Sequence, residues 1–92
     1  LIAYPSDAEN AIHICFKAFK QLALTEWDKG NQYFSPTTFQ FYEIKSGVAG
    51  NVIPGILTAK FNFRFAPTSQ VEDLQHRIEE ILNRYHLKYS MQ

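Results

Sequence analysis

The sequence predicts an α+β domain of the ferredoxin-like type, a two-layer sandwich in which two helices cover one face of an antiparallel sheet. Two segments carry apolar residues at helical spacing, and the segment between them alternates apolar with polar residues. The elements follow one another as helix, strand, strand, helix, strand. The complete βαββαβ arrangement needs one more strand at its start, in the centre of the sheet, and no periodicity marks one. We therefore expect an incomplete ferredoxin-like domain that lacks the first strand.

Both helices are predicted to begin at the same kind of motif. The segments Ser6–Glu9 and Ser69–Glu72 fit the capping box, in which a Ser and a Glu side chain each satisfy a free backbone N–H at a helix start. We expect the first helix to run to about Trp27, before Gly30, and the second to end near His86. The apolar faces comprise Ile12, Cys15, Phe16, Phe19, Leu22 and Ala23 in the first helix and Val71, Leu74, Ile78, Ile81, Leu82 and Tyr85 in the second.

The middle of the chain is predicted to form two antiparallel strands. Residues alternate without a break over Ile56–Phe65, which is typical of a strand with one face on the core and one in water. A second strand, Thr38–Lys45, alternates less regularly, and the Ser46–Gly55 segment joins the two as a long hairpin loop. A short third strand is expected at Leu87–Met91. The predicted core face of the longest strand comprises Leu57, Ala59, Phe61, Phe63 and Phe65, and its open face Ile56, Thr58, Lys60, Asn62 and Arg64.

The composition limits the possible partners. The chain has 92 residues, enough for one small domain (1–92), and nine basic residues balance nine acidic ones. A net charge of zero argues against binding to nucleic acid, which requires cations to displace counterions from phosphates. No apolar run approaches the ~20 residues that span a bilayer, so we expect no membrane association and a cytoplasmic location. Because the chain lacks an initiator methionine, we expect it to be an excerpt from a longer protein.

No catalytic residues and no metal ligands are predicted within the chain. His13 and Cys15 are two residues apart and point to different sides of a helix, so they cannot chelate one metal ion. Cys15 is interpreted as a core residue, and His76 and His86 as solvated surface residues. No Gly-x-Ser-x-Gly motif, Cys/His pair or phosphate-binding loop occurs.

The open face of the longest strand offers one candidate binding residue. Arg64 is a planar bidentate donor suited to a carboxylate, and Lys60 and Asn62 flank it. A routine solvated strand face explains the same residues, and the pattern alone leaves both interpretations open. An RNA-binding sheet is not expected, because the aromatic residues Phe61 and Phe63 share the core face and not the open one.

Several separated motifs resemble a known enzyme family. The residues Trp27-Asp28-Lys29-Gly30-Asn31, Phe34-Ser35-Pro36-Thr37 and Asn51-Val52-Ile53-Pro54, followed by Phe61–Phe65, resemble the middle of bacterial succinyl-diaminopimelate desuccinylases. Ala3-Tyr4-Pro5 agrees as well, so the resemblance covers essentially the whole chain. These enzymes belong to the dinuclear-zinc amidohydrolases related to carboxypeptidase G2 and aminoacylase.

The resemblance implies a role within a larger enzyme. The parent would hydrolyse N-succinyl-diaminopimelate to succinate and diaminopimelate for lysine and cell-wall synthesis. Its catalytic domain would hold two zinc ions and the general base, and this chain would be an inserted lid that pairs with its copy. We expect a homodimer through the edge strand Thr38–Lys45 and the first helix. A lid of a related N-acyl-amino-acid hydrolase and a free-standing ferredoxin-like interaction or ligand-sensing module are the alternatives.

The resemblance also implies three substrate-binding residues. Arg64 matches an arginine that binds a substrate carboxylate, and Tyr4 matches a tyrosine that lines the pocket. Asn51 matches an asparagine that reaches across the dimer toward the neighbour's substrate. Three positions depart from the family pattern: Gly50 replaces a first asparagine, Leu1 occupies the place of a histidine that stabilises the oxyanion, and Ser6 stands where a second histidine is common.

Overall fold

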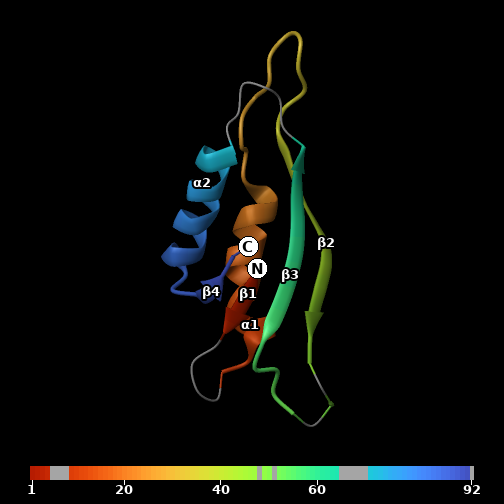
Figure 1. Cartoon of the computed structure of the whole chain (residues 1–92), viewed down its shortest axis with the longest axis vertical. Helices are drawn as coiled ribbons and strands as arrows, with labels where there is room; N and C mark the ends of the chain where they lie inside the picture. Colours follow the sequence, from red (N-terminus) through yellow and green to blue (C-terminus); the bar gives the residue numbers. More distant parts are fainter. Residues whose placement is uncertain (5–8, 48, 51, 65–70, 92) are drawn as a thin grey trace.

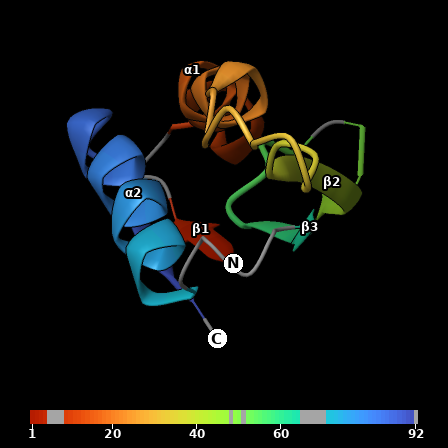
Figure 2. The same ribbon diagram turned by 90° about the horizontal axis from the view of Figure 1, so that it is seen from above.

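Six elements follow one another along the part of the chain that a computed structural model describes, residues 1–4, 9–47, 49–50, 52–64 and 71–91. The order is β1, α1, β2, β3, α2, β4 (Figure 1). Both helices pack against one face of the sheet, as Figure 2 shows from above, so the predicted α+β two-layer sandwich is confirmed. The bounds are β1 Ile2–Tyr4, α1 Ala11–Leu24, β2 Thr38–Ser46, β3 Leu57–Arg64, α2 Val71–Arg84 and β4 Lys88–Ser90.

The first strand, which we expected to be absent, is present. The four strands lie in the order β2-β3-β1-β4, and all neighbours are antiparallel. β1 therefore occupies the central position that βαββαβ topology requires, with Ala3 opposite Leu57 on one side and Tyr89 on the other. The prediction was wrong because β1 has only three residues, too few for an alternating pattern to be recognised.

The first helix is shorter than predicted at both ends. Its N-cap is Asn10, whose side-chain oxygen accepts hydrogen bonds from the backbone N–H groups of Ile12 and His13. Its last residue is Leu24 and not Trp27. Trp27 is instead buried against Phe39 and Phe63 of the sheet, because the large apolar ring gains more from the core than from another helical turn.

The other predicted boundaries agree with the structure to within two or three residues where they can be compared. α2 ends at Arg84, and His86 follows in the left-handed conformation with φ 58°. The Leu87 N–H then donates to the Leu82 carbonyl and closes the helix end. The predicted capping residues Ser6 and Ser69 lie outside the described residues.

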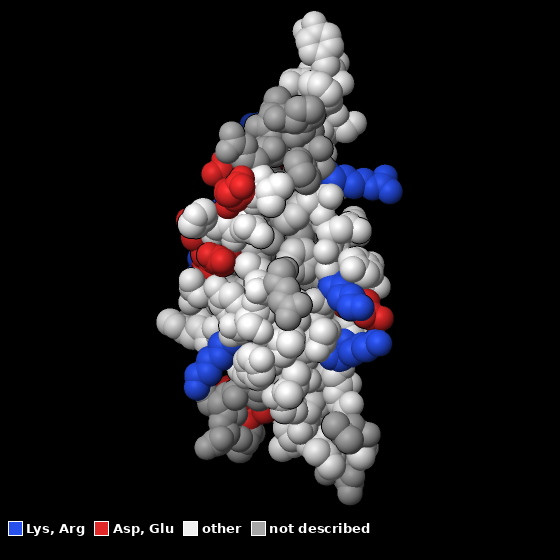
Figure 3. Space-filling view, in the orientation of Figure 1, with Lys and Arg blue, Asp and Glu red and all other residues white. Residues whose placement is uncertain are grey.

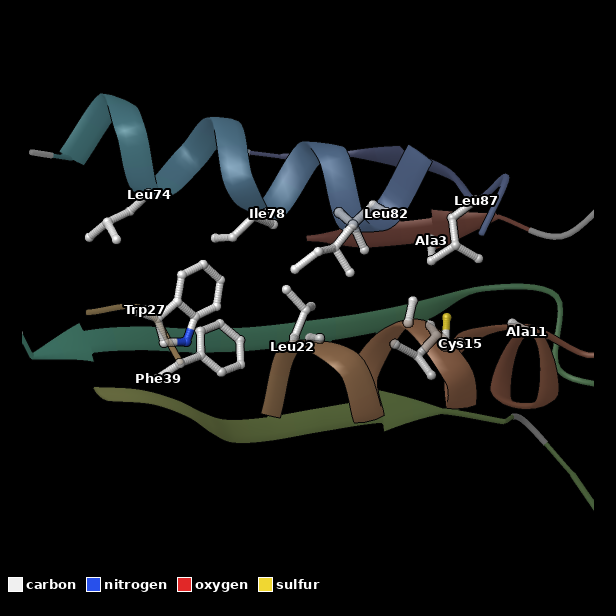
Figure 4. Packing of buried hydrophobic residues seen from close by; sticks show 14 residues of the cluster. Ala3, Ala11, Cys15, Leu22, Trp27, Phe39, Leu74, Ile78, Leu82 and Leu87 are labelled. Atoms are coloured by element: carbon white, nitrogen blue, oxygen red, sulfur yellow. The ribbon is translucent and has the colours of Figure 1, made fainter. Parts of the chain in front are cut away.

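The core lies between the helices and the sheet. Leu74, Ile78 and Leu82 of α2 project toward Trp27, Phe39 and Leu22 (Figure 4). The predicted core face of β3 is confirmed for its described part, since Leu57 and Ala59 are buried and Phe61 and Phe63 are half-buried. Phe65 lies outside the described residues. The fully and largely buried apolar side chains are Ala3, Ala11, Cys15, Ala18, Leu22, Trp27, Phe39, Leu57, Ala59, Leu74, Ile78, Ile81, Leu82 and Leu87.

A register shift in β2 explains its irregular pattern. Phe41 lies opposite Phe61, whereas Glu43 lies opposite Lys60, so Tyr42 is an extra residue at a β-bulge. The bulge leaves Tyr42 exposed and brings Ile44 opposite the buried Ala59.

Candidate functional site

Two of the three predicted substrate-binding residues, Tyr4 and Arg64, lie far apart in the structure. Arg64 ends β3, whereas Tyr4 follows Ala3, which is paired with Leu57 at the start of β3. The seven steps between Leu57 and Arg64, at ~3.3 Å each, separate the two ends by about 23 Å. Tyr4, on β1, therefore lies beside the start of β3, whereas Arg64 lies at its end. Asn51 lies outside the described residues, and the loop that contains it joins β2 to β3 at the Tyr4 end.

Arg64 is an exposed cation on the open face of the sheet. Its neighbours on this face are Asn62 on β3 and Thr38 and Gln40, which lie opposite them on β2. Within the described part of the chain, the structure has ion pairs only from Glu43 to Lys60 (3.1 Å) and to Lys45 (3.5 Å), so Arg64 has no carboxylate partner there.

Glu43 engages the other cations of this face. Its pKa lies below the ordinary value, chiefly because the Lys60 side chain hydrogen-bonds the carboxylate, and Lys45 contributes. Glu43 therefore stays ionised at neutral pH and offsets the charge of Lys60. Arg64 is therefore better placed than Lys60 to receive a carboxylate from a ligand.

The charges are segregated although the net charge is zero. Lysine and arginine side chains extend from the β2 and β3 side in Figure 3, and acidic side chains gather over α2, which carries Glu72, Asp73, Glu79 and Glu80. Basic residues outnumber acidic ones on β2 and β3, whereas acidic residues outnumber basic ones on α2.

Tyr4 projects from the same open face. It alternates with the buried Ala3, and its side chain is 40% exposed. Lys88 of β4 lies directly opposite Tyr4 in the strand register. The Tyr4 end of the sheet therefore also carries a cation, as the other end does at Arg64.

The described residues offer no suitable donor set for the zinc ions that the resemblance implies for the parent. Among the described residues no three His, Cys, Asp or Glu side chains converge on one point. His13 is exposed on α1, whereas Cys15 is buried, and burial raises the pKa of its thiol to about 11. The thiol is therefore protonated at neutral pH, which makes it a poor metal ligand and a poor nucleophile.

A second surface lies along the edge strand β2. Phe41 on β2 contacts Phe19 on α1 at a ring-centroid distance of 4.7 Å, so α1 lies beside this edge. Phe16, one helical turn before Phe19, is 61% exposed, and Ile44 on β2 is 51% exposed. Tyr42 adds a further exposed aromatic ring.

This exposed apolar surface is only partly evident from the sequence. The helical period assigned Phe16 to the apolar face, and the structure shows that it lies at the margin of that face, outside the core. Periodicity finds the apolar arc of a helix but does not tell which part of a wide arc meets the protein's own core. An apolar arc wider than the contact with the core leaves apolar side chains such as Phe16 exposed.

In the part of the chain that the structure describes, no helix has the length and apolar character needed to cross a membrane.

The comparisons with known proteins agree with this architecture. Residues 2–90 match the peptidase dimerisation domain of the M20 family, so the chain belongs to that family of domains. The relatives found are named succinyl-diaminopimelate desuccinylase, which agrees with the resemblance seen in the motifs. The chain is 55% identical over 92 residues to the protein of Coxiella burnetii (strain RSA 493 / Nine Mile phase I), and this match covers 99% of the chain and 25% of that relative.

Two further relatives show the same coverage. The Nitrosospira multiformis protein is 51% identical over 92 residues, and the Marinobacter nauticus protein is 44% identical over 91 residues. Each match covers 99% of this chain and 24% of the relative. The chain thus spans about a quarter of the length of the curated relatives that it matches.

Proposed function

We propose that the chain is the dimerisation and lid domain of a desuccinylase that hydrolyses N-succinyl-diaminopimelate to succinate and diaminopimelate. The observation that carries this proposal is the match over nearly the whole chain to desuccinylases of which it covers a quarter. The described residues contain no cluster of three metal-binding side chains, and the Cys15 thiol is protonated at neutral pH. The two zinc ions and the general base would therefore belong to the remainder of the parent. Its place in lysine synthesis and its cytoplasmic location are part of the same proposal.

We further propose that β2 and α1 form the homodimer interface. β2 is an edge strand of nine residues, and a free edge offers unpaired backbone N–H and C=O groups to another strand. Pairing of β2 with its copy across a two-fold axis would join two sheets, and α1 would meet its copy beside them. The exposed side chains of Phe16 and Ile44 would be buried by this contact.

The separation of Tyr4 from Arg64 supports a substrate site built from two protomers. Arg64 lies at one end of β3, and the loop that carries Asn51 begins at the other. A single small substrate spans less than this distance, so one protomer would supply Arg64 and its partner Asn51. Tyr4 would be supplied by the same protomer as Asn51.

The activity of the full-length protein tests the function. We expect hydrolysis of N-succinyl-diaminopimelate in preference to N-acetylated amino acids. Arg64→Met should lower kcat/KM by about 10- to 100-fold, because a charge-assisted bond to a substrate carboxylate is lost. Lys60→Met is the matched control on the same face and should change it little. Preference for another acyl group would indicate one of the related N-acyl-amino-acid hydrolases. An unchanged kcat/KM in Arg64→Met would show that Arg64 does not bind the substrate.

The interface is tested by solution mass in a concentration series. Ile44→Lys places a charge on the β2 edge and should shift the protein toward monomer. Ile56→Lys is the matched control, since Ile56 is 53% exposed but precedes β3. If both variants have the mass of the wild-type dimer at every concentration, the β2 edge is not the interface.

A further inference from the structure

The segment between α1 and β2 comprises residues 25–37, and we call its part 28–37 the arm. It extends beyond the sheet at the upper end of the molecule in Figure 1, along the longest dimension of 52 Å. β2 begins directly after it, with Thr38 opposite Arg64, so the arm stands at the Arg64 end of the sheet. Connections of this length in a small domain are usually functional.

Hydrogen bonds close the arm at its base. The Asp28 carboxylate accepts from the backbone N–H of Gly30 (3.0 Å) and of Thr37 (2.9 Å), and also from the Thr37 hydroxyl. Thr37 is only 5% exposed, so this junction is shielded from water. Residues nine positions apart are thus held together, as in a compact Ω-loop.

A second set of bonds fixes the tip. The Asn31 side chain accepts from the N–H groups of Tyr33 and Phe34 (2.8 and 2.9 Å), and the Asn31 N–H donates to the Phe34 carbonyl (2.9 Å). Gly30 has φ +67°, and a Cβ there would lie 2.6 Å from the Phe34 carbonyl oxygen. The tip therefore has one tightly defined conformation.

The fixed tip displays two aromatic rings to solvent. Tyr33 is 79% exposed and Phe34 is 42% exposed. The projecting end is free of charged side chains in the view of Figure 3. An exposed aromatic residue on a preorganised backbone loses little further conformational entropy when it binds a partner. Aromatic residues of this kind are common among the hot spots of protein interfaces.

We propose that the arm docks on the rest of the full-length polypeptide and holds the Arg64 end of the sheet against it. This inference rests on the proposed function, in which this chain is about a quarter of a longer parent, as it is of its relatives, and the remainder of that parent supplies the receiving surface. A second copy of this domain is disfavoured as the receiver, because its contact surface would lie along the β2 edge and the arm lies beyond the strand ends. The receiving surface would be uncharged, with a recess for an aromatic ring. Within one polypeptide a small contact suffices, because the effective concentration is high.

Hydroxyl-radical footprinting of the full-length protein tests docking without reference to activity. Tyr33 should be oxidised several-fold more slowly in the wild type than in Gly30→Ala, in which the strained turn releases the arm. Equal oxidation of Tyr33 in both proteins would overturn the proposal. If the wild type hydrolyses no succinylated substrate, the proposed function fails, and the footprint still decides whether the arm is docked.

Tyr33→Ser and the control Gln32→Ser, both in the arm, complete the experiment. Tyr33→Ser should lower kcat/KM about tenfold and leave the dimer mass unchanged, because an aromatic anchor is lost at the docked contact. Gln32→Ser should change neither. An unchanged kcat/KM in Tyr33→Ser, or a loss of dimer in that variant, would overturn the assignment of the arm to the rest of the polypeptide.

Discussion

At the scale of single residues, the backbone of the arm depends on one glycine. Gly30 combines a positive φ with backbone atoms of Phe34 and Pro36 at 2.6 and 2.7 Å from an added Cβ. Gly55, by contrast, has open space around it and no such φ. The same residue type is therefore required at one position and replaceable at the other.

Gly30→Ala should reduce the free energy of unfolding by about 1–3 kcal/mol, because alanine is strained in this conformation and the neighbouring backbone must move. Gly55→Ala should change it by less than about 0.5 kcal/mol, or stabilise slightly. Denaturant unfolding followed by circular dichroism measures both. Equal effects of the two substitutions would contradict the strain at Gly30.

At the scale of elements, Arg77 connects α2 to the segment that follows α1. Its guanidinium donates to the carbonyl oxygens of Trp27 and Glu26 and lies 4.9 Å from the centroid of the Trp27 ring. The helical period of the sequence places Arg77 on the polar face of α2. The structure assigns it to a tertiary contact, because the chain leaves α1 early and brings Trp27 beneath it.

Arg77→Ala should destabilise the domain by about 1.5–3 kcal/mol, since two charge-assisted hydrogen bonds and a ring contact are lost together. Arg84→Ala removes the same charge from the last turn of α2, where the side chain is exposed, and should cost less than about 1 kcal/mol. Thermal unfolding compares the two. A similar loss in both variants would show that charge, and not the Trp27 contact, matters.

At the scale of the whole molecule, stability and association are expected to be linked. The domain is small, and it exposes apolar side chains along β2 and α1 that a partner would cover. Whatever binds the native state alone shifts the unfolding equilibrium toward that state by mass action. The interface would thus add to the stability of the fold.

The unfolding midpoint of the full-length protein should therefore rise with protein concentration, by a few degrees per tenfold increase. In Ile44→Lys this dependence should be weaker and the midpoint lower at high concentration. Scanning calorimetry at three concentrations measures the effect. A wild-type midpoint that is independent of concentration, together with the mass of a monomer, would contradict a dimer formed by this domain.

The sequence by itself determined the elements whose pattern is long. Ile56–Phe65 alternates over ten residues, and the second helix keeps one apolar face over four turns, so both were predicted closely. The separated motifs also identified the family, and Arg64 was recognised as a carboxylate-binding candidate on the open face. Local pattern suffices for these features, because periodicity and capping depend on neighbouring residues.

Only the tertiary structure decided the rest. β1 is a strand because Leu57 and Tyr89 flank Ala3 from distant parts of the chain, and three residues carry no period of their own. Trp27 lies outside α1 because its side chain is buried against residues that are distant in the sequence, Phe39 and Phe63. The separation of Tyr4 and Arg64 likewise follows from strand register, which pairs residues across the sheet and is not readable from either residue alone.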